Sequence, residues 1–193
     1  MEILDTRKLD HHRFLSLFKT AYRDRRGNEK NWVFASRCDP PKILTGEFST
    51  PDAVVIAALH AERNALVVVE EFRVTLGGYQ LGLPAGLVDS GETVEAAATR
   101  ELKEETGLEL VQIKSVSPPI YSSSGMTDES VTMVFCECRG VPSNIANEAS
   151  EDIRVRFVGR SEAARICEDR RSKTDAKAWL VLNGFSMSGR LVA

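Results

Sequence analysis

The sequence predicts an α+β fold, in which helices cover both faces of one sheet and a β-hairpin precedes this main domain. Several short apolar runs rich in branched residues have the length of buried strands, and a few amphipathic stretches have the period of helices. These elements follow one another without regular alternation, which is typical of α+β proteins. A chain of 193 residues can hold one such domain and an appendage. We therefore expect residues 1–50 to form a hairpin subdomain and residues 51–193 to form the main domain.

Composition excludes several classes of protein. The hydrophobic content of 42% and the charged content of 27% are ordinary for a globular chain. A formal net charge of -3 argues against a nucleic-acid partner. No apolar run approaches the roughly 18 residues of a membrane span, and the stretch Met1–Asp5 lacks the basic and apolar regions of a secretory signal. We expect a cytoplasmic protein with neither a nucleic-acid nor a membrane partner.

The cysteines favour a reducing compartment. They are Cys38, Cys136, Cys138 and Cys167, and no two of them form a CxxC pair. Cys136 and Cys138 lie in a strand-like run, where both would face the same side of the sheet. We predict buried free thiols rather than a zinc site.

The N-terminal hairpin is predicted from two strand-like segments. Phe14–Asp24 and Asn31–Arg37 have the composition of strands, and the polar stretch Arg25–Glu29, which contains Gly27, predicts the turn between them. The two prolines of Asp39–Pro41 then end regular structure.

The main domain is expected to open with two buried strands. These are the branched apolar runs Ala53–Leu59 and Ala65–Val69, separated by a polar turn at His60–Asn64. Gly77–Gly78 marks another turn, and Gln80–Leu83 is predicted to be a short strand.

A helix is predicted after this strand. Thr93 has the side chain of an N-cap residue, and Gly107 is suited to end the helix. One face of the helix is apolar and suited to packing on a sheet; it carries Val94, Ala97, Ala98 and Leu102.

The C-terminal part is predicted to hold three further strands and two helices. The strands are Leu110–Val116, Ser130–Cys138 and Ile153–Val158. The first helix is Ser161–Arg170, with Ser161 as its N-cap, and the second is Asp175–Leu182, which carries Trp179.

Charged residues gather on the first predicted helix. Arg100, Glu101, Glu104 and Glu105 stand within two helical turns, and the i,i+3 and i,i+4 spacings let the three carboxylates point to one side. Like charges at this spacing repel. A hard divalent cation such as Mg²⁺ or Mn²⁺ would offset the repulsion, because it prefers carboxylate oxygens and bridges to substrate phosphates. The alternative is a solvated acidic helix face.

The spacing over the wider stretch 86–108 argues against this alternative. Its defined positions are Gly86, five residues, Glu92, seven residues, Arg100-Glu101-Leu102, one residue, Glu104-Glu105, one residue and Gly107-Leu108. This pattern resembles the Nudix box at every defined position, so the chain is similar to the Nudix hydrolases.

The resemblance implies a fold and a reaction. The fold would be an α/β/α sandwich with a mixed sheet. The reaction would be hydrolysis of a nucleoside diphosphate linked to another group, with two or three Mg²⁺ or Mn²⁺ ions per site. Glu101, Glu104 and Glu105 would be catalytic metal ligands with Arg100 beside them, and the backbone carbonyl of Ala85 would be a further ligand.

The flanking segments resemble one branch of this family, the ADP-ribose pyrophosphatases and nucleoside-diphosphate-sugar (NDP-sugar) hydrolases. The similar segments are Gly27–Arg37, Glu70–Arg73, Leu76–Tyr79 and Leu83–Gly86. The resemblance implies cleavage of ADP-ribose or a related NDP-sugar to a nucleoside monophosphate and a sugar phosphate. It also implies a homodimer in which the N-terminal hairpins exchange between subunits.

The same resemblance implies the substrate-binding residues. Trp32 would stack on the base, Arg37 and Arg73 would contact the ligand, and the remaining members of the set are Gly86, Gly125 and Met126. From the residues alone, a place in the core is the commoner fate of a strand tryptophan such as Trp32, and Arg73 could be a surface ion-pair residue.

Two departures leave the substrate open between ADP-ribose and other NDP-sugars. Ser124 stands where the branch usually has proline, and Gly82 stands where it often has glutamate. The general base has two candidates, Glu151 before the last strand and Glu129 in the loop that starts at Gly125. A Nudix enzyme acting on another nucleotide or dinucleotide is an alternative function, and a non-catalytic ADP-ribose sensor is a further one.

Overall fold

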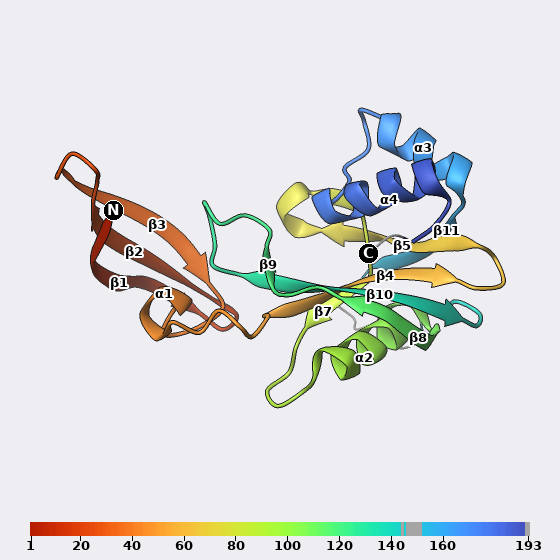
Figure 1. The fold of residues 1–193 in the computed structure, drawn as a ribbon, viewed down its shortest axis with the longest axis horizontal. Coiled ribbons are helices and arrows are strands. Elements are labelled where there is room, and N and C mark those ends of the chain that lie inside the picture. The colour runs from red at the N-terminus through yellow and green to blue at the C-terminus, as the bar shows by residue number, and fades with distance from the viewer. Residues whose placement is uncertain (144, 146–151, 192–193) are drawn as a thin grey trace. The chain divides into compact units, whose positions relative to one another are not determined.

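A computed structural model of the chain describes residues 1–143, 145 and 152–191, which belong to two compact units. The first unit comprises Met1–Asp52 and Pro118–Val131, and the second comprises Ala53–Ser117 and Thr132–Ala193 (Figure 1). The segment that starts at Pro118 therefore leaves the second unit and returns to it within β10.

The first unit is built on an antiparallel sheet in the order β1-β2-β3. Its strands are β1 (Glu2–His12), β2 (Leu15–Arg23) and β3 (Glu29–Ser36). The predicted hairpin corresponds to β2 and β3. Strand β1 escaped prediction because its sequence is polar and nearly all of it is exposed, so it has no alternating apolar pattern.

A buried ion pair holds the rest of the first unit together. The short helix α1 (Lys42–Thr45) begins with a lysine that is only 3% exposed. Its Nζ donates to Asp52 Oδ2 at 2.6 Å and to Ser130 Oγ at 2.7 Å. Ser130 opens β10, and β9 (Ile120–Tyr121) pairs with this end of the strand. Because a buried charge is costly without its partner, the Lys42–Asp52 pair fixes α1 against these segments.

The second unit contains the larger sheet, in which strands follow the order β11-β5-β4-β10-β8. Their bounds are β4 (Ala53–His60), β5 (Ala65–Arg73), β8 (Glu109–Val116), β10 (Ser130–Arg139) and β11 (Ile153–Val158). Strand β6 (Gly78–Gly82) pairs with β5, and β7 (Ala85–Leu87) pairs with β4. The short helical turn η1 (Val74–Leu76) connects β5 to β6.

Helices lie on both faces of this sheet, as predicted (Figure 1). Helix α2 (Val94–Thr106) covers one face and contacts β4, β7 and β8. Helices α3 (Arg160–Glu168) and α4 (Ala176–Ser188) pack on each other at the other face. In the part of the chain that the structure describes, no helix combines the length and apolar character needed to cross a bilayer.

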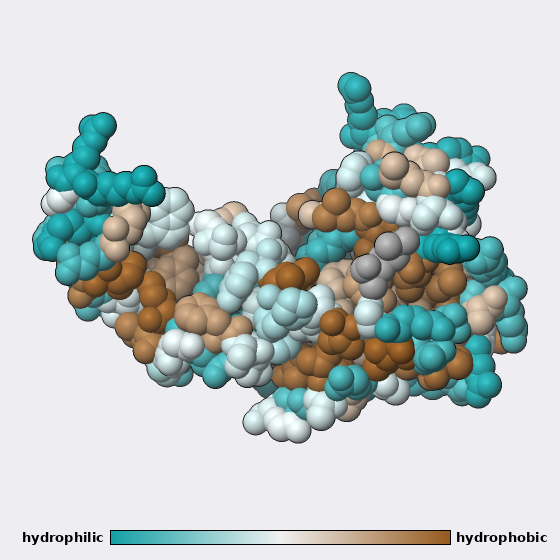
Figure 2. Space-filling view, in the orientation of Figure 1, coloured by the Kyte–Doolittle hydropathy of each residue, from teal (hydrophilic) through white to brown (hydrophobic). Residues whose placement is uncertain are grey.

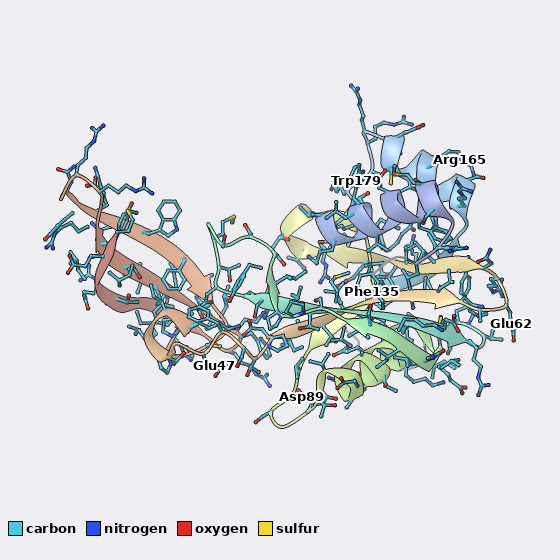
Figure 3. The ribbon with its side chains drawn as sticks, viewed as in Figure 1. Glu47, Glu62, Asp89, Phe135, Arg165 and Trp179 are labelled. Carbon is cyan, nitrogen blue, oxygen red and sulfur yellow. The ribbon has the colours of Figure 1, made fainter. Side chains whose placement is uncertain are left out.

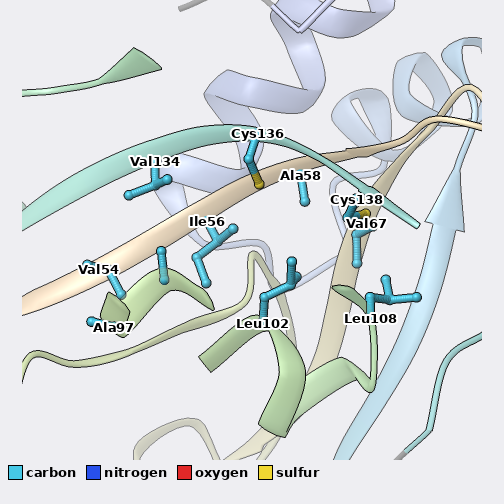
Figure 4. Close-up of a cluster of buried hydrophobic side chains, with 11 residues drawn as sticks. Val54, Ile56, Ala58, Val67, Ala97, Leu102, Leu108, Val134, Cys136 and Cys138 are labelled. Atoms are coloured by element: carbon cyan, nitrogen blue, oxygen red, sulfur yellow. The ribbon is translucent and has the colours of Figure 1, made fainter. Parts of the chain in front are cut away.

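The core beneath α2 confirms the predicted apolar helix face. Ala97, Ala98 and Leu102 have no exposed surface and pack against β4 and β10 (Figure 4). Cys136 and Cys138 of β10 are fully buried in the same cluster, and burial raises the pKa of each thiol to about 12. These two thiols are therefore protonated packing groups at neutral pH.

Other parts of the cysteine prediction need correction. All four cysteines are free, but Cys38 and Cys167 are half-buried rather than buried. Both lie near the ends of elements, where the sequence shows no burial pattern.

Two local predictions are wrong. The N-cap of α3 is Gly159 and not Ser161, because the helix begins at Arg160. His60 is not in a polar turn but is the last residue of β4, 1% exposed, with its ring edge-on to Phe157 and Nε2 3.0 Å from the Gly140 carbonyl oxygen. Nε2 of His60 thus has a partner, whereas Nδ1 is buried with no hydrogen-bond partner among the described residues. The polarity of histidine conceals such a buried strand end from sequence analysis.

Candidate active site

The candidate active site of the second unit is built where β7 leads into α2. Pairing of Val54 with Gly86 and of Val55 with Ala85 fixes β7 to the buried strand β4. Helix α2 then begins at its predicted N-cap, Thr93, whose Oγ1 accepts a hydrogen bond from the Ala96 N–H at 3.2 Å. It ends at the predicted Gly107, which has φ of 74°. Both the strand and the helix are therefore held in place at the site.

Gly86 and Glu101 lie in direct contact within this arrangement. A Cβ atom at position 86 would stand 1.9 Å from Cδ and Oε1 of Glu101, far inside van der Waals contact. Only glycine allows the Glu101 carboxylate to approach the backbone this closely. The box glycine thus makes room for a carboxylate.

Glu105 is anchored on the neighbouring residue of β7. Its side chain accepts a hydrogen bond from the Ala85 N–H at Oε2, with a distance of 3.1 Å, and the residue is 6% exposed. Carboxylates of Glu101 and Glu105 are therefore fixed beside consecutive residues of β7, Gly86 and Ala85. The i,i+4 spacing on α2 accounts for this placement.

Arg100 links the glutamates. Its guanidinium forms a two-point pair with Glu92, at 3.0 Å through Nε and 2.8 Å through Nη2. Its Nη1 donates to Glu101 Oε1 at 2.7 Å and to Glu104 Oε2 at 3.1 Å. The hydrogen bonds with Glu92 raise the pKa of Arg100, and the same guanidinium lowers the pKa of Glu92. The Arg100–Glu92 pair is therefore charged at neutral pH.

The loop between β7 and α2 closes around this network. Arg100 Nη2 also donates to the Leu87 carbonyl oxygen at 3.0 Å, and the Asp89 N–H donates to Glu92 Oε2 at 3.1 Å. Asp89 lies in this loop (Figure 3). Glu92 is thus a structural member of the site; the spacing pattern had marked its position without giving it a role.

The donor set fits a hard divalent cation. Glu101, Glu104, Glu105 and the Ala85 carbonyl offer only oxygen ligands, which Mg²⁺ and Mn²⁺ prefer. Among the described residues, no group of three or more His, Cys, Asp and Glu side chains is arranged to hold a metal ion. Glu101 and Glu104 are instead turned to the Nη1 group of Arg100. The chemistry of the cluster fits a cation, and Arg100 balances part of its negative charge in this arrangement.

The predicted residues of the first unit meet along β3. Trp32 Nε1 donates to the Gly125 carbonyl oxygen at 3.0 Å, and the Ala35 N–H donates to the Met126 carbonyl oxygen at 2.8 Å. The Arg37 guanidinium pairs with the Glu129 carboxylate through Nε. Tertiary pairing thus places the loop Ser122–Glu129 beside β3, although more than 80 residues separate them in sequence.

Trp32 lines a cavity of about 470 Å³ within this unit, and its side chain is not part of the core. The residue is 51% exposed. Other aromatic residues at the cavity are Tyr22, Phe34, Phe48 and Tyr121. The space-filling view shows hydrophobic side chains gathered at the surface of this unit (Figure 2). An exposed indole beside an apolar cavity is suited to stack on a planar ring.

Several cavity residues were missed from the sequence. Tyr22 and Phe34 lie two residues from Thr20 and Trp32 on β2 and β3, and the register pairs Thr20 with Trp32. Alternation along the two predicted strands would have found this face. Asp128 of the loop also lines the cavity, and no local signal marks it.

The remaining predicted residues lie apart from these contacts. Arg73 Nη1 pairs with Glu71 Oε1 at 2.7 Å at the end of β5, which fits the surface ion-pair alternative in this arrangement. Met126 is 72% exposed. Glu151 lies outside the described residues.

A carboxylate-rich strand–loop–helix on one face of a helix-covered sheet defines an α/β/α domain with an acidic site. A model of the NUDIX domain matches residues 49–180, which is well over half of the chain, and the chain belongs to the Nudix family. The predicted family and fold are confirmed. Nudix hydrolases are generally dependent on divalent metal ions.

Relatives within the family are also similar in sequence. The chain is 31% identical over 125 residues to the ADP-ribose pyrophosphatase of Saccharomyces cerevisiae and 32% identical over 127 residues to the ADP-sugar pyrophosphatase of Mus musculus. These matches cover 65% and 63% of this chain but 53% and 54% of those proteins, so the chain spans about half the length of the curated relatives it matches. A crystal structure of an ADP compounds hydrolase shares the fold, with a TM-score of 0.71 over 98% of this chain and 96% of that chain at 19% identity.

Proposed function

We propose that the protein is a Nudix pyrophosphatase that cleaves the pyrophosphate bond of ADP-ribose or a related NDP-sugar. The products would be a nucleoside monophosphate and a sugar phosphate. The placement of Glu101 and Glu105 against β7 is the observation that carries this proposal, because it aligns two carboxylates with the Ala85 backbone. The names of the yeast and mouse relatives support the substrate class.

We assign the metal ligands to Glu101, Glu104, Glu105 and the Ala85 carbonyl, with two or three Mg²⁺ or Mn²⁺ ions per site. Such ions would supply positive charge to the pyrophosphate oxygens, where negative charge builds up during phosphoryl transfer. Glu105 and Glu101 are the fixed members of this set, because β7 holds both. Glu104 is the adaptable member, since its side chain is about half exposed and is held by Arg100.

Arg100 has the role of holding the carboxylates in place before substrate binds. Its pair with Glu92 fixes the guanidinium, and the fixed guanidinium orients Glu101 and Glu104. Charged groups positioned in advance do not have to reorganise during the reaction.

Recognition of the substrate is assigned to two sets of residues. In the first unit, Trp32 would stack on the base and Arg37 would bind the anionic part of the ligand, with Gly125 and Met126 in the adjoining loop. In the second unit, Arg73 and Gly86 complete the set. For Arg73 to bind a ligand anion, its pair with Glu71 must open or be shared.

We further propose that the protein is a homodimer. Leu15, Leu17 and Val33 lie on the first unit's sheet and are each between 39% and 49% exposed. Leu17 pairs with Ala35 and Lys19 with Val33, so these apolar side chains share one face of the sheet. Burying them against a second copy would remove apolar surface from water. Sedimentation equilibrium that gave the monomer mass at all concentrations would contradict this assembly.

The free thiols support a cytoplasmic location. Cell fractionation of the tagged chain is the direct measurement, and recovery in an oxidising compartment would contradict the assignment.

A substrate panel tests the proposed activity. ADP-ribose, other NDP-sugars and dinucleotides are each incubated with the protein and Mg²⁺, Mn²⁺ or EDTA, and the products are resolved by chromatography. We expect AMP and ribose 5-phosphate from ADP-ribose, and no turnover in EDTA. Cleavage of dinucleotides alone would favour the alternative substrate class, and tight binding of ADP-ribose without cleavage would favour a sensor.

The variant Glu105→Gln tests the metal assignment. The amide oxygen of glutamine can still accept from the Ala85 N–H, so we expect the fold to persist. Loss of the charge should lower kcat by about 100-fold or more and weaken Mg²⁺ binding. Glu95→Gln in the first turn of the same helix is the matched control. Equal activity of Glu105→Gln and the control would refute the assignment.

A further inference from the structure

The loop Ser122–Glu129 is attached to β3 at successive residues. Ser36 Oγ donates to Asp128 Oδ2 at 3.0 Å, and the same oxygen accepts from the Lys42 N–H at 2.9 Å. Backbone hydrogen bonds join Ala35 to Met126 and, at 3.4 Å, to Asp128. Glu129 follows directly, and its own N–H donates to Thr127 Oγ1 at 3.1 Å. These contacts hold the backbone of Glu129 in place without any contribution from its own side chain.

The Glu129 side chain pairs with Arg37 through a single guanidinium nitrogen. Oε1 of Glu129 accepts from Nε of Arg37, at the inner edge of the guanidinium. Among the residues that the structure describes, Arg37 makes no second hydrogen bond. A guanidinium has five N–H donors, so the four donors on Nη1 and Nη2 are available to a ligand. The Arg37 side chain is 36% exposed, which leaves these groups accessible.

We propose that Glu129 is a positioning residue for Arg37 and not the general base. This inference rests on the proposed function. By holding Nε, the carboxylate fixes the plane of the guanidinium and presents its outer fork to a phosphate of the ligand's pyrophosphate. Holding the long side chain in advance removes the entropic cost of ordering it on binding.

The geometry separates this role from that of a base. A general base must direct a lone pair at the water or hydroxyl whose proton it takes. Oε1 of Glu129 accepts from the Arg37 N–H instead, so one of its two carboxylate oxygens is already engaged, and the backbone of Glu129 is tied to Thr127. A residue held in this way acts through Arg37, so its effect should appear in binding rather than in the chemical step.

The test compares Glu129→Gln, Arg37→Gln and the double variant, with ADP-ribose as substrate. We expect Glu129→Gln to raise KM about tenfold and to change kcat less than threefold, because the amide oxygen can still accept from Nε but the bond is no longer one between opposite charges and holds the guanidinium less firmly. The acidic limb of the pH profile of kcat should stay where it is in the wild type. In the Arg37→Gln background, Glu129→Gln should have almost no further effect, because the group through which it acts is gone. Glu109→Gln, which breaks an exposed Arg139–Glu109 pair, is the matched control.

A fall of kcat by 100-fold or more in Glu129→Gln, with loss of the acidic limb and persistence in the Arg37→Gln background, would overturn the inference in favour of a base. Equal KM values for wild type and Glu129→Gln would overturn it as well.

Ligand binding separates failure of this inference from failure of the proposed function. The chain has two tryptophans, so Trp179→Phe leaves Trp32 as the single fluorescent reporter. In this background ADP-ribose is titrated without turnover in EDTA. If the protein hydrolyses nothing but binds ADP-ribose, a tenfold weaker affinity in Glu129→Gln still supports the inference. Absence of ADP-ribose binding and hydrolysis by the wild type overturns both.

Discussion

In the second unit, an arginine and four glutamates come from one helix and the loop before it, whereas the first unit assembles its candidate recognition residues from distant segments. Arg100 and its partners all lie between Leu87 and Glu104 in the chain. Trp32 and Arg37, by contrast, meet partners 93 and 92 residues away. Local geometry can therefore fix the acidic site, but only tertiary pairing can fix the recognition site.

If local geometry fixes the acidic site, its activity must depend on the close contact between Glu101 and Gly86 of β7. Gly86→Ala tests this, because the added Cβ would stand 1.9 Å from the Glu101 carboxylate. We expect Glu101 to be displaced and kcat/KM for ADP-ribose to fall by about 100-fold or more. Gly159→Ala, where a Cβ would meet nothing within 4 Å, is the control. Full activity of Gly86→Ala would show that Glu101 need not stand where the structure places it.

The acidic site should also depend on the core behind it. Leu102→Ala removes a fully buried side chain next to Glu101, and we expect the free energy of unfolding to fall by about 2–5 kcal/mol. Val111→Ala on β8, where the side chain is half exposed, should cost far less. Urea denaturation of both variants gives the two values. A similar small loss in both would mean that the α2 interface is loosely packed.

These two variants address what the sequence predicted well. Helix α2, its caps and its buried face follow from residues within one or two turns, so spacing alone located Thr93, Leu102 and Gly107. The apolar strands were also found from local sequence, because strands that are buried on both faces have continuous apolar runs.

The sequence predicted other parts poorly because their partners are distant. Strand β1 is exposed and polar, so its pairing with β2 leaves no pattern. The contacts of Trp32 with Gly125 and of Arg37 with Glu129 span two chain segments, and family resemblance, not local spacing, pointed to these residues. Asp128 and Lys42 were missed because a polar residue in a loop carries no sign of burial.

The variant Trp32→Ala tests the candidate recognition site of the first unit. Base–aromatic stacking contributes about 1–3 kcal/mol, so KM for ADP-ribose should rise by about 10- to 100-fold. Because Trp32 is half exposed, thermal stability should change little. Trp179→Ala is the matched control: Trp179 lies on α4, and its Nε1 donates to the Cys167 carbonyl oxygen at 3.3 Å (Figure 3). If both variants bind ADP-ribose equally well, Trp32 has no part in recognition.

The smallest expected effect concerns the start of α2. Thr93→Ala removes the N-cap hydrogen bond to Ala96 and should lower the free energy of unfolding by about 1 kcal/mol. Ser161→Ala, at the position where the sequence suggested a cap and the structure has none, should have almost no effect. Thermal denaturation monitored by circular dichroism separates the two. A loss of about 1 kcal/mol in Ser161→Ala as well would place the start of α3 where the sequence put it, and no loss in Thr93→Ala would contradict the cap of α2.

The burial of the Lys42–Asp52 pair makes the acylation rate of Lys42 a measure of how often the segment around α1 opens. An amine-directed acylating reagent reacts with exposed lysines such as Lys30 at once, but it can reach the Lys42 Nζ only when the segment around α1 opens. Mass spectrometry of the acylated peptides would therefore time the opening of the segment around α1, whether it opens locally or with the whole chain.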